Sequence, residues 1–288
     1  MKSLREVIKE ADDKGIAIGH FNISNLEMLK GVFEAAKELN MPVIVGVSEG
    51  ERDYIGVEQA VALVRSLREE YDFPIFLNAD HSYSFERTKE AIDASFDAVI
   101  FDGAKLPLLE NIEITKRCVD YARASGKDVL VEAEVGYIGT SSQVIDAIPE
   151  GIDLKNFTKK EEAENFINAT GIDLFAPSVG NIHGFIKGIG NPALNIEAIR
   201  DLKNAIKTPL VLHGGSGISP EDFKEAIRAG IRIIHISTEM RVLYQKSTKE
   251  AIDESIEKNE VAPYKYDASV VEDLKNFVKN YITMFSSV

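Results

Sequence analysis

Short runs rich in isoleucine, valine and phenylalanine recur along the chain, and a longer segment with helical spacing follows each of them. This alternation is the pattern of parallel βα units, in which a buried strand is followed by a helix. Eight strands are expected, at residues 16–22, 42–48, 74–80, 97–102, 128–134, 172–177, 209–213 and 231–237. Helices are expected at 25–40, 57–71, 84–94, 109–125, 159–169, 196–205, 220–229, 240–258 and 269–284.

Eight such units favour a closed (β/α)₈ barrel, a TIM barrel with extra C-terminal helices, over an open Rossmann sheet, which normally divides into two halves. Neither a Pro/Ser-rich linker nor a further repeat interrupts the alternation, so residues 1–288 are expected to form a single domain. Two long segments, 136–154 and 180–191, follow the carboxyl ends of strands, where barrels place their active sites.

Local capping signals support this interpretation. Ser24 and Glu27 have the spacing of a capping box, and Ser219 followed by Pro220 is typical of an N-cap with proline in the first turn. Gly230 suits the position that ends a helix.

Charge and composition exclude several classes of protein. The chain has 33 Lys+Arg and 47 Asp+Glu, a net charge of −14, and no basic run, which argues against a nucleic-acid or anionic-membrane binder. Its apolar runs stay well short of the ~18 residues that a spanning helix needs. The single cysteine, Cys118, excludes an internal disulfide and is expected to be a small buried thiol. The N-terminal segment lacks the features of a secretory or transit peptide, so a cytoplasmic location is expected.

All five histidines fall at or just beyond the carboxyl end of a predicted strand: His20, His81, His183, His213 and His235. Histidines with purely structural roles are expected on helices and at both ends of a barrel. Imidazole is a common zinc ligand, and a catalytic zinc site uses three protein ligands and leaves one position open.

Three of these histidines follow strands that can converge over one barrel mouth, namely His81, His183 and His213. Glu134 ends the fifth strand and is either a fourth ligand, a group that orients a histidine, or a solvated acid. His213 also opens a glycine-rich segment, HGGSG, that leads into a capped helix, so its backbone N–H groups are suited to binding a phosphate. Ser237 and Thr238 add hydroxyl groups after the eighth strand. Alternatively, the glycines of HGGSG serve only the geometry of a tight turn.

At these residues the sequence resembles the class II, metal-dependent fructose-bisphosphate aldolases and their relatives that act on tagatose bisphosphate and other ketose phosphates. The likeness covers nearly the whole chain. The motifs that carry it are GHFN (19–22), PVIVGVS (42–48), the Asp80–His81 pair, VEAEVG (131–136), GNIHG (180–184) with Lys187, and HGGSG (213–217).

The resemblance implies zinc, or another divalent cation, held by His81, His183 and His213, with Glu134 at or near the metal. It implies that Asp80 is the acid/base residue, which takes the C4 hydroxyl proton of a ketose bisphosphate during cleavage to dihydroxyacetone phosphate and glyceraldehyde 3-phosphate. It also implies a homo-oligomer, a dimer or a tetramer, and a monovalent cation in the loop after strand 6. The substrate- and phosphate-binding positions implied by the resemblance or expected from their place at the mouth are Asn22, Ser48, Gly184, Lys187, Gly214, Ser216, His235, Ser237 and Thr238.

Three departures from the family pattern bear on the expected site. The loop at 139–146 lacks the glutamate that shuttles a proton in relatives, and Asp146 or Glu150 could replace it. His235 stands where relatives have asparagine, and His20 replaces a small residue. Lys265 occupies the region of a basic motif near the C-terminus.

Two other functions stay open from the sequence. A metal-dependent hydrolase on the same barrel would use Asp80 to activate a water molecule. A non-catalytic descendant would keep metal and sugar-phosphate binding only. The apolar helix at 270–285 could contact another subunit or cap the barrel.

Overall fold

Parallel β-strands form the centre of the protein in a computed structural model that describes residues 2–140, 143–148, 151–152, 157–188 and 190–287. The barrel strands are β1 (Ile18–Asn22), β2 (Val43–Val47), β3 (Ile75–Ser82), β4 (Ala98–Phe101), β5 (Leu130–Val135), β7 (Leu174–Pro177), β9 (Leu210–Leu212) and β10 (Ile231–Ile236). Within the described residues these eight strands close in the order β1-β10-β9-β7-β5-β4-β3-β2. The predicted (β/α)₈ barrel is therefore confirmed.

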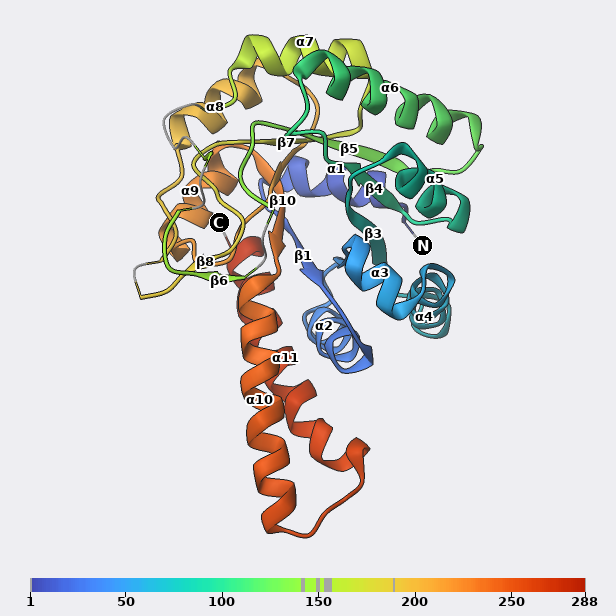
Figure 1. Ribbon diagram of the computed structural model, residues 1–288, viewed down its shortest axis with the longest axis vertical. Coiled ribbons are helices and arrows are strands. Elements are labelled where there is room, and N and C mark those ends of the chain that lie inside the picture. Colours follow the sequence, from blue (N-terminus) through green and yellow to red (C-terminus); the bar gives the residue numbers. More distant parts are fainter. Residues whose placement is uncertain (1, 141–142, 149–150, 153–156, 189, 288) are drawn as a thin grey trace.

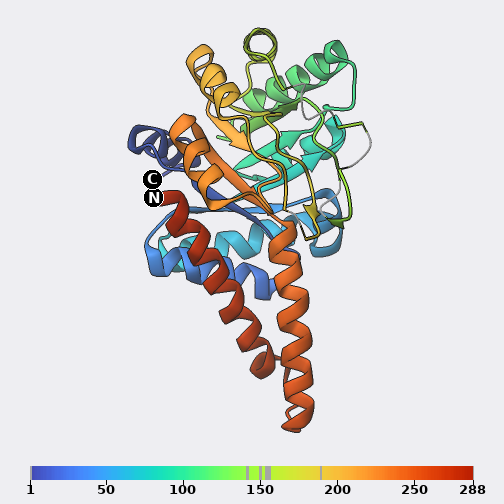
Figure 2. The ribbon, with the colours of Figure 1, turned by 90° about the vertical axis from the view of Figure 1, so that its left-hand side faces the viewer.

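Helices cover the outside of this barrel (Figures 1 and 2). They are α1 (Leu4–Lys14), α2 (Leu26–Leu39), α3 (Glu49–Ile55), α4 (Val57–Tyr71), α5 (Phe85–Ala94), α6 (Leu108–Ala124), α7 (Lys160–Thr170), α8 (Ile196–Ala205), α9 (Pro220–Ala229), α10 (Thr238–Glu257) and α11 (Pro263–Ser286). Helices α1 and α3 were not predicted. Two short strands, β6 (Val144–Ile145) and β8 (Phe185–Ile186), pair in a separate sheet above the barrel mouth.

The predicted caps are partly confirmed. Ser219 caps α9 with Pro220 in its first turn, and Gly230 ends that helix. The capping box at Ser24 is wrong, because Asn25 is the N-cap of α2 and accepts a hydrogen bond from the backbone N–H of Met28. Cys118 is fully buried, as predicted.

Side chains inside the barrel change from apolar to polar along several of the strands. The layer near the strand starts includes Ile18, Ile44, Phe76, Leu130, Val211 and Ile233, and it packs against the buried face of α1. Alternate residues of a strand share a face, so the next inward positions on β1, β5 and β10 are His20, Glu132 and His235. The barrel therefore has an apolar bottom and a polar upper layer.

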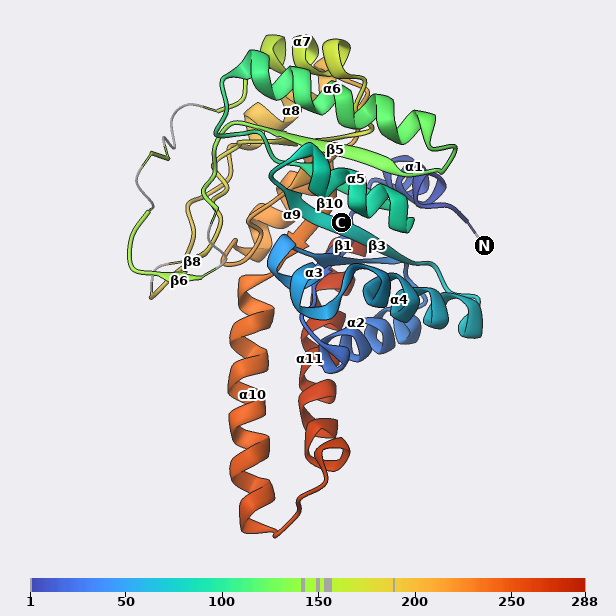
Figure 3. The same cartoon turned by 45° about the vertical axis from the view of Figure 1, so that its right-hand side comes forward.

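Helices α10 and α11 run side by side and project away from the barrel (Figures 1 and 3). One face of α11 is buried, formed by Val270, Leu274, Val278, Ile282 and Phe285, and Leu274 lies so close to α2 that a Cβ added at Gly31 would be 2.6 Å from its Cβ. This face therefore packs within the chain. Among the described residues, no helix is both long and apolar enough to span a membrane.

Candidate active site and metal centre

A pocket opens at the carboxyl ends of the barrel strands, the end where the sequence predicts the site. Its lining includes the predicted residues Asn22, Ser48, Asp80, His81, His183, Gly184, His213, Gly214, Ser216, His235, Ser237 and Thr238. Of the other predicted residues, Glu134 is buried near the histidines, whereas Lys187 is exposed and lies outside the lining.

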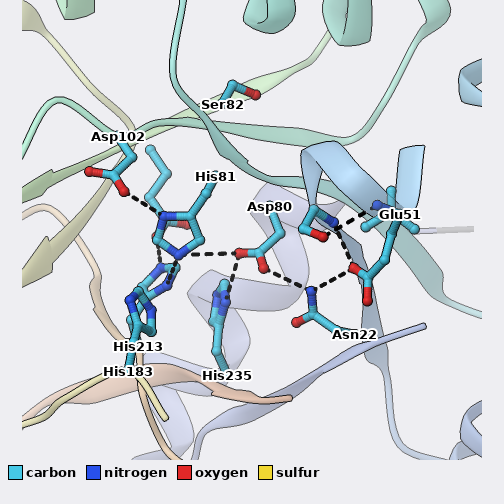
Figure 4. Close-up of polar contacts among 12 residues, drawn as sticks. Asn22, Glu51, Asp80, His81, Ser82, Asp102, His183, His213 and His235 are labelled. Atoms are coloured by element: carbon cyan, nitrogen blue, oxygen red, sulfur yellow. Dashed lines mark hydrogen bonds and ion pairs between the residues drawn. The ribbon is translucent and has the colours of Figure 1, made fainter. Parts of the chain in front are cut away.

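Four buried side chains come together at this pocket. Ligand atoms of His81, Glu134, His183 and His213 all lie within 4.8 Å of one another. The Nε2 atom of His81 is 3.0 Å from Nδ1 of His213 (Figure 4). The cluster that the sequence predicts as a metal centre is thus assembled by strands β3 and β5, by the residue that directly follows β9, and by the loop after β7.

The other ring nitrogen of each histidine is held by an oxygen atom. His81 Nδ1 is 2.9 Å from Asp102, His183 Nδ1 is 2.7 Å from the carbonyl oxygen of Gly139, and His213 Nε2 is 2.7 Å from Glu132. Such partners fix the tautomer and ring orientation of metal-binding histidines. They leave His81 Nε2, His183 Nε2 and His213 Nδ1 free to face a common ion.

Sequence reasoning missed Asp102 and Glu132 as partners of these histidines. Asp102 directly follows β4, and Glu132 precedes Glu134 by two residues on β5, so both glutamates share the inward face. An acid inside an otherwise apolar strand was the available signal for Glu132. The partner that each acid contacts lies on a distant strand and could not be deduced.

Burial sets the protonation of the cluster. It lowers the pKa of His183 to about 4 and that of His213 well below its usual range, so both rings are neutral and able to bind a metal. Burial also opposes the charge of His81, but Asp80 and Asp102 outweigh it and raise its pKa to about 10. His81 therefore carries a proton at neutral pH when no cation is bound.

The surroundings of Glu134 also fit a cation. Both of its carboxylate oxygens are buried and have no hydrogen-bond partner among the described residues. Burial, together with the charge of Asp102, raises its pKa well above the usual range. Because a buried carboxylate without a partner is costly, this oxygen, together with His183, His213 and a deprotonated His81, forms a donor set suited to a divalent cation such as zinc.

Asp80 and His81 both face the pocket although they are consecutive on β3. Consecutive strand residues normally point to opposite faces. Here the pairing of β3 with β4 shifts register between Ala79 and Ser82, and His81 has a left-handed backbone with φ of +41°. This irregularity turns both side chains toward the mouth, and it explains why β3 continues two residues beyond its predicted end.

The Asp80 carboxylate is oriented by two neighbours (Figure 4). The side-chain amide of Asn22 donates to its Oδ2 at 2.8 Å, and Nδ1 of His235 lies 3.3 Å from its Oδ1. Burial opposes ionisation, but His81 and His235 outweigh it and hold the pKa of Asp80 well below its usual range. Asp80 is therefore a carboxylate positioned to accept a proton.

The glycine-rich segment after β9 provides one end of the pocket. Gly214 has φ of +62°, and a Cβ there would lie 2.2 Å from the carbonyl oxygen of Ile182, so only glycine fits. The N-terminus of α10 also faces the pocket, where Thr238 and Ser237 line it, and no side chain caps the helix. The buried Ser237 hydroxyl has no partner among the described residues, which is suited to an anionic ligand.

A buried carboxylate, Glu51, lies behind the residues that line the pocket. Glu51 accepts hydrogen bonds from the backbone N–H of Ser48 and from the Asn22 amide, at 2.8 and 3.1 Å. Its other oxygen pairs with Arg241, 2.6 Å away on α10. The sequence analysis missed both members of this ion pair, because they belong to different units of the barrel.

The structure separates several remaining residues from the pocket. Lys265 pairs with Glu260 near the tip of the α10–α11 hairpin, and Asp146 is exposed outside the lining. Glu150 lies outside the described residues. From the loop after β5, Thr140 reaches the pocket.

A family profile, two related sequences and a solved structure that match this chain are all described as aldolases. A family profile described as "Fructose-bisphosphate aldolase class-II" matches residues 2–288. Fructose-bisphosphate aldolases of Staphylococcus epidermidis (strain ATCC 35984) and Staphylococcus aureus (strain Mu50) are each 36% identical over 288 residues, covering 99% of this chain and 97% of the relative. The crystal structure of the YdjI aldolase from Escherichia coli K12 superposes with a TM-score of 0.82 at 30% identity, covering 99% of this chain and 97% of that one.

Proposed function

Because this chain belongs to the class-II fructose-bisphosphate aldolase family, a family of metal-dependent carbon–carbon lyases, we propose that it reversibly cleaves fructose 1,6-bisphosphate or a close ketose phosphate such as tagatose 1,6-bisphosphate. The products are dihydroxyacetone phosphate and glyceraldehyde 3-phosphate. The observation that carries this proposal is the cluster of His81, His183, His213 and Glu134 beside an ionised Asp80, at a pocket that also has an anion-binding end.

We assign the metal ligands to the three histidines and Glu134, with Zn²⁺ as the ion that this donor set favours. When bound, a divalent cation supplies Lewis-acid stabilisation of the enediolate charge that develops when the C3–C4 bond breaks, a contribution of several kcal/mol. Asp102, Glu132 and the carbonyl of Gly139 hold the ligand rings in place for that role.

Asp80 acts as the base in the cleavage direction. Its carboxylate takes the proton of the C4 hydroxyl group, the C4–O electrons form the aldehyde, and the C3–C4 electron pair passes to the enediolate. The enediolate takes a proton from solvent at C3 to become dihydroxyacetone phosphate. Asn22 and His235 keep the carboxylate oriented toward the substrate. In the condensation direction the same residue returns the proton to the aldehyde oxygen.

The phosphate of the dihydroxyacetone portion binds at the glycine-rich end. The backbone of Gly184, Gly214 and Ser216 and the hydroxyls of Ser237 and Thr238 surround it beside the N-terminus of α10. Asn22 and Ser48 then lie toward the other end of the sugar. Roles for Lys187 and for a monovalent cation in the loop after β7 stay predictions.

We also propose a homo-oligomer, a dimer or a tetramer. Large apolar side chains are exposed at the tip of the α10–α11 hairpin, where Ile256, Val261 and Tyr264 are 69%, 87% and 78% accessible. Light scattering of the wild type and of Ile256→Glu tests this assignment, since a monomeric wild type would contradict it. A cytoplasmic location and one domain over residues 1–288 stay predictions.

The test of the proposed function is coupled detection of triose phosphate release from fructose 1,6-bisphosphate. The protein is assayed as isolated, after chelation, and after zinc is restored. Activity that chelation abolishes and zinc restores is the expected result. Release of inorganic phosphate instead would indicate a hydrolase, and metal binding without turnover of either ketose bisphosphate would indicate a binding protein.

A further inference from the structure

Two buried histidines that are not metal ligands in the proposed site stack face to face inside the barrel. His20 on β1 and His235 on β10 are register partners on neighbouring strands. Their ring centroids are 3.5 Å apart and their planes differ by 8°. Gly46 on β2 makes room for the pair, because a Cβ there would lie 2.1 Å from Cε1 of His20.

His20 has no polar contact that explains its presence. The residue is fully buried, and neither ring nitrogen has a hydrogen-bond partner among the described residues. Leaving such a group unpaired costs free energy that packing must offset. The face of the ring, which covers His235, is therefore its principal contact.

The stacked geometry also argues against a metal ion shared by His20 and His235. Imidazole donates to a metal in the plane of its ring, at about 2.0–2.1 Å. Two nearly parallel rings 3.5 Å apart place any shared ion far out of at least one plane. His20 therefore contacts His235 through its aromatic face and not through its nitrogen lone pairs.

His235 links this stack to Asp80. Its opposite face lies against His213, with ring centroids 3.9 Å apart, so the ring is held between two others. From this position its Nδ1 lies 3.3 Å from Asp80 Oδ1, a close polar contact outside hydrogen-bond geometry, and neither ring nitrogen has a hydrogen-bond partner among the described residues (Figure 4). Ring packing therefore holds the orientation from which His235 contacts the carboxylate.

We propose that His20 is a positioning residue for the aldol cleavage: its ring face keeps His235 directed at Asp80, and thereby keeps the Asp80 carboxylate aligned with the substrate hydroxyl. This inference rests on the proposed function of Asp80 as the base. The Asn22 contact on the other carboxylate oxygen is braced by Glu51, so loss of His20 disturbs one of two supports. A small misalignment of a catalytic group lowers the rate of the chemical step far more than substrate binding.

Three substitutions of zinc-loaded enzyme test the proposal. His20→Ala removes the ring, His20→Leu fills the space without a flat face, and His20→Phe keeps an aromatic face without nitrogens. We expect the alanine and leucine variants to lower kcat about 10- to 100-fold with KM within about threefold, and phenylalanine to keep kcat within about threefold. Ile18→Ala, a buried cavity variant one layer below on β1, serves as the control and should lower Tm without changing kcat.

Metal content and Tm are measured for every variant. Wild-type kcat in both His20→Ala and His20→Leu would overturn the proposal, as would a phenylalanine variant as impaired as alanine or a leucine variant as active as phenylalanine. A crystal structure of His20→Leu gives a readout that does not depend on turnover, since His235 should turn away from Asp80 and an unmoved ring would refute the role. An inactive wild type would instead contradict the proposed function.

Discussion

Replacing Glu132 by glutamine should weaken metal binding without destabilising the metal-free protein. Glu132 Oε1 lies 2.7 Å from His213 Nε2, and both side chains are buried. Glutamine has the same shape and can still accept this hydrogen bond, but it lacks the negative charge. Loss of such a partner typically lowers metal affinity 10- to 100-fold, or about 1.4–2.8 kcal/mol.

Glu132→Gln should not lower the stability of the metal-free protein. The second oxygen of Glu132 has no hydrogen-bond partner among the described residues, and the carboxyl group is buried in the barrel. Burial raises the pKa of Glu132 to about 8, which shows that the ionised form is disfavoured there. A neutral amide removes that cost, so Tm after chelation should stay equal to that of the wild type or rise.

The affinity is measured by competition with a chromophoric chelator at neutral pH, and Tm is measured in parallel on chelated protein. Glu164→Gln, at an exposed position of α7, is the matched control and should change neither quantity. A dissociation constant for Glu132→Gln within twofold of the wild type would refute the role of Glu132 as the support of His213. A large fall in the Tm of the metal-free variant would refute the expectation that the substitution does not destabilise this form.

Three further outcomes are expected. Asp80→Ala should retain zinc but lose at least about 100-fold in kcat, because the base is missing, and wild-type turnover would remove Asp80 from that role. His213→Ala should lower zinc content measured by elemental analysis, and full occupancy with unchanged affinity would exclude it as a ligand. At Asp12, burial raises the pKa, but Lys203 and Arg232 outweigh it and lower the pKa below the unfolded value. Asp12→Asn should therefore reduce the free energy of unfolding by up to about 1 kcal/mol at neutral pH, and chemical denaturation should show that difference shrinking as the pH falls below about 4.

The fold was predictable because its signals are local. Each barrel strand overlaps its predicted range, because a buried run of β-branched residues can be recognised from a few neighbouring residues. The errors are also local: α1 was not predicted, and the N-cap of α2 was assigned to Ser24 instead of Asn25. Ser24 instead donates to Glu51, a contact 27 residues away.

The convergence of His81, His183 and His213 could likewise be expected, because the carboxyl ends of parallel strands meet at one mouth. Which oxygen atom holds each ring could not be expected. Asp102 and Glu132 meet their histidines across 21 and 81 residues of sequence, and those pairings depend on the register of strands in the closed barrel.

By itself, the sequence determined the barrel, and it predicted the end at which the site lies and the residues proposed for it, because strand and helix periods and strand ends are encoded in neighbouring residues. Only the tertiary structure decided how those residues are oriented. Closure of the barrel places β1 beside β10 and so stacks His20 on His235. The shifted register of β3 turns Asp80 and His81 to the same side. Both effects arise from contacts between segments distant in sequence, which no local pattern specifies.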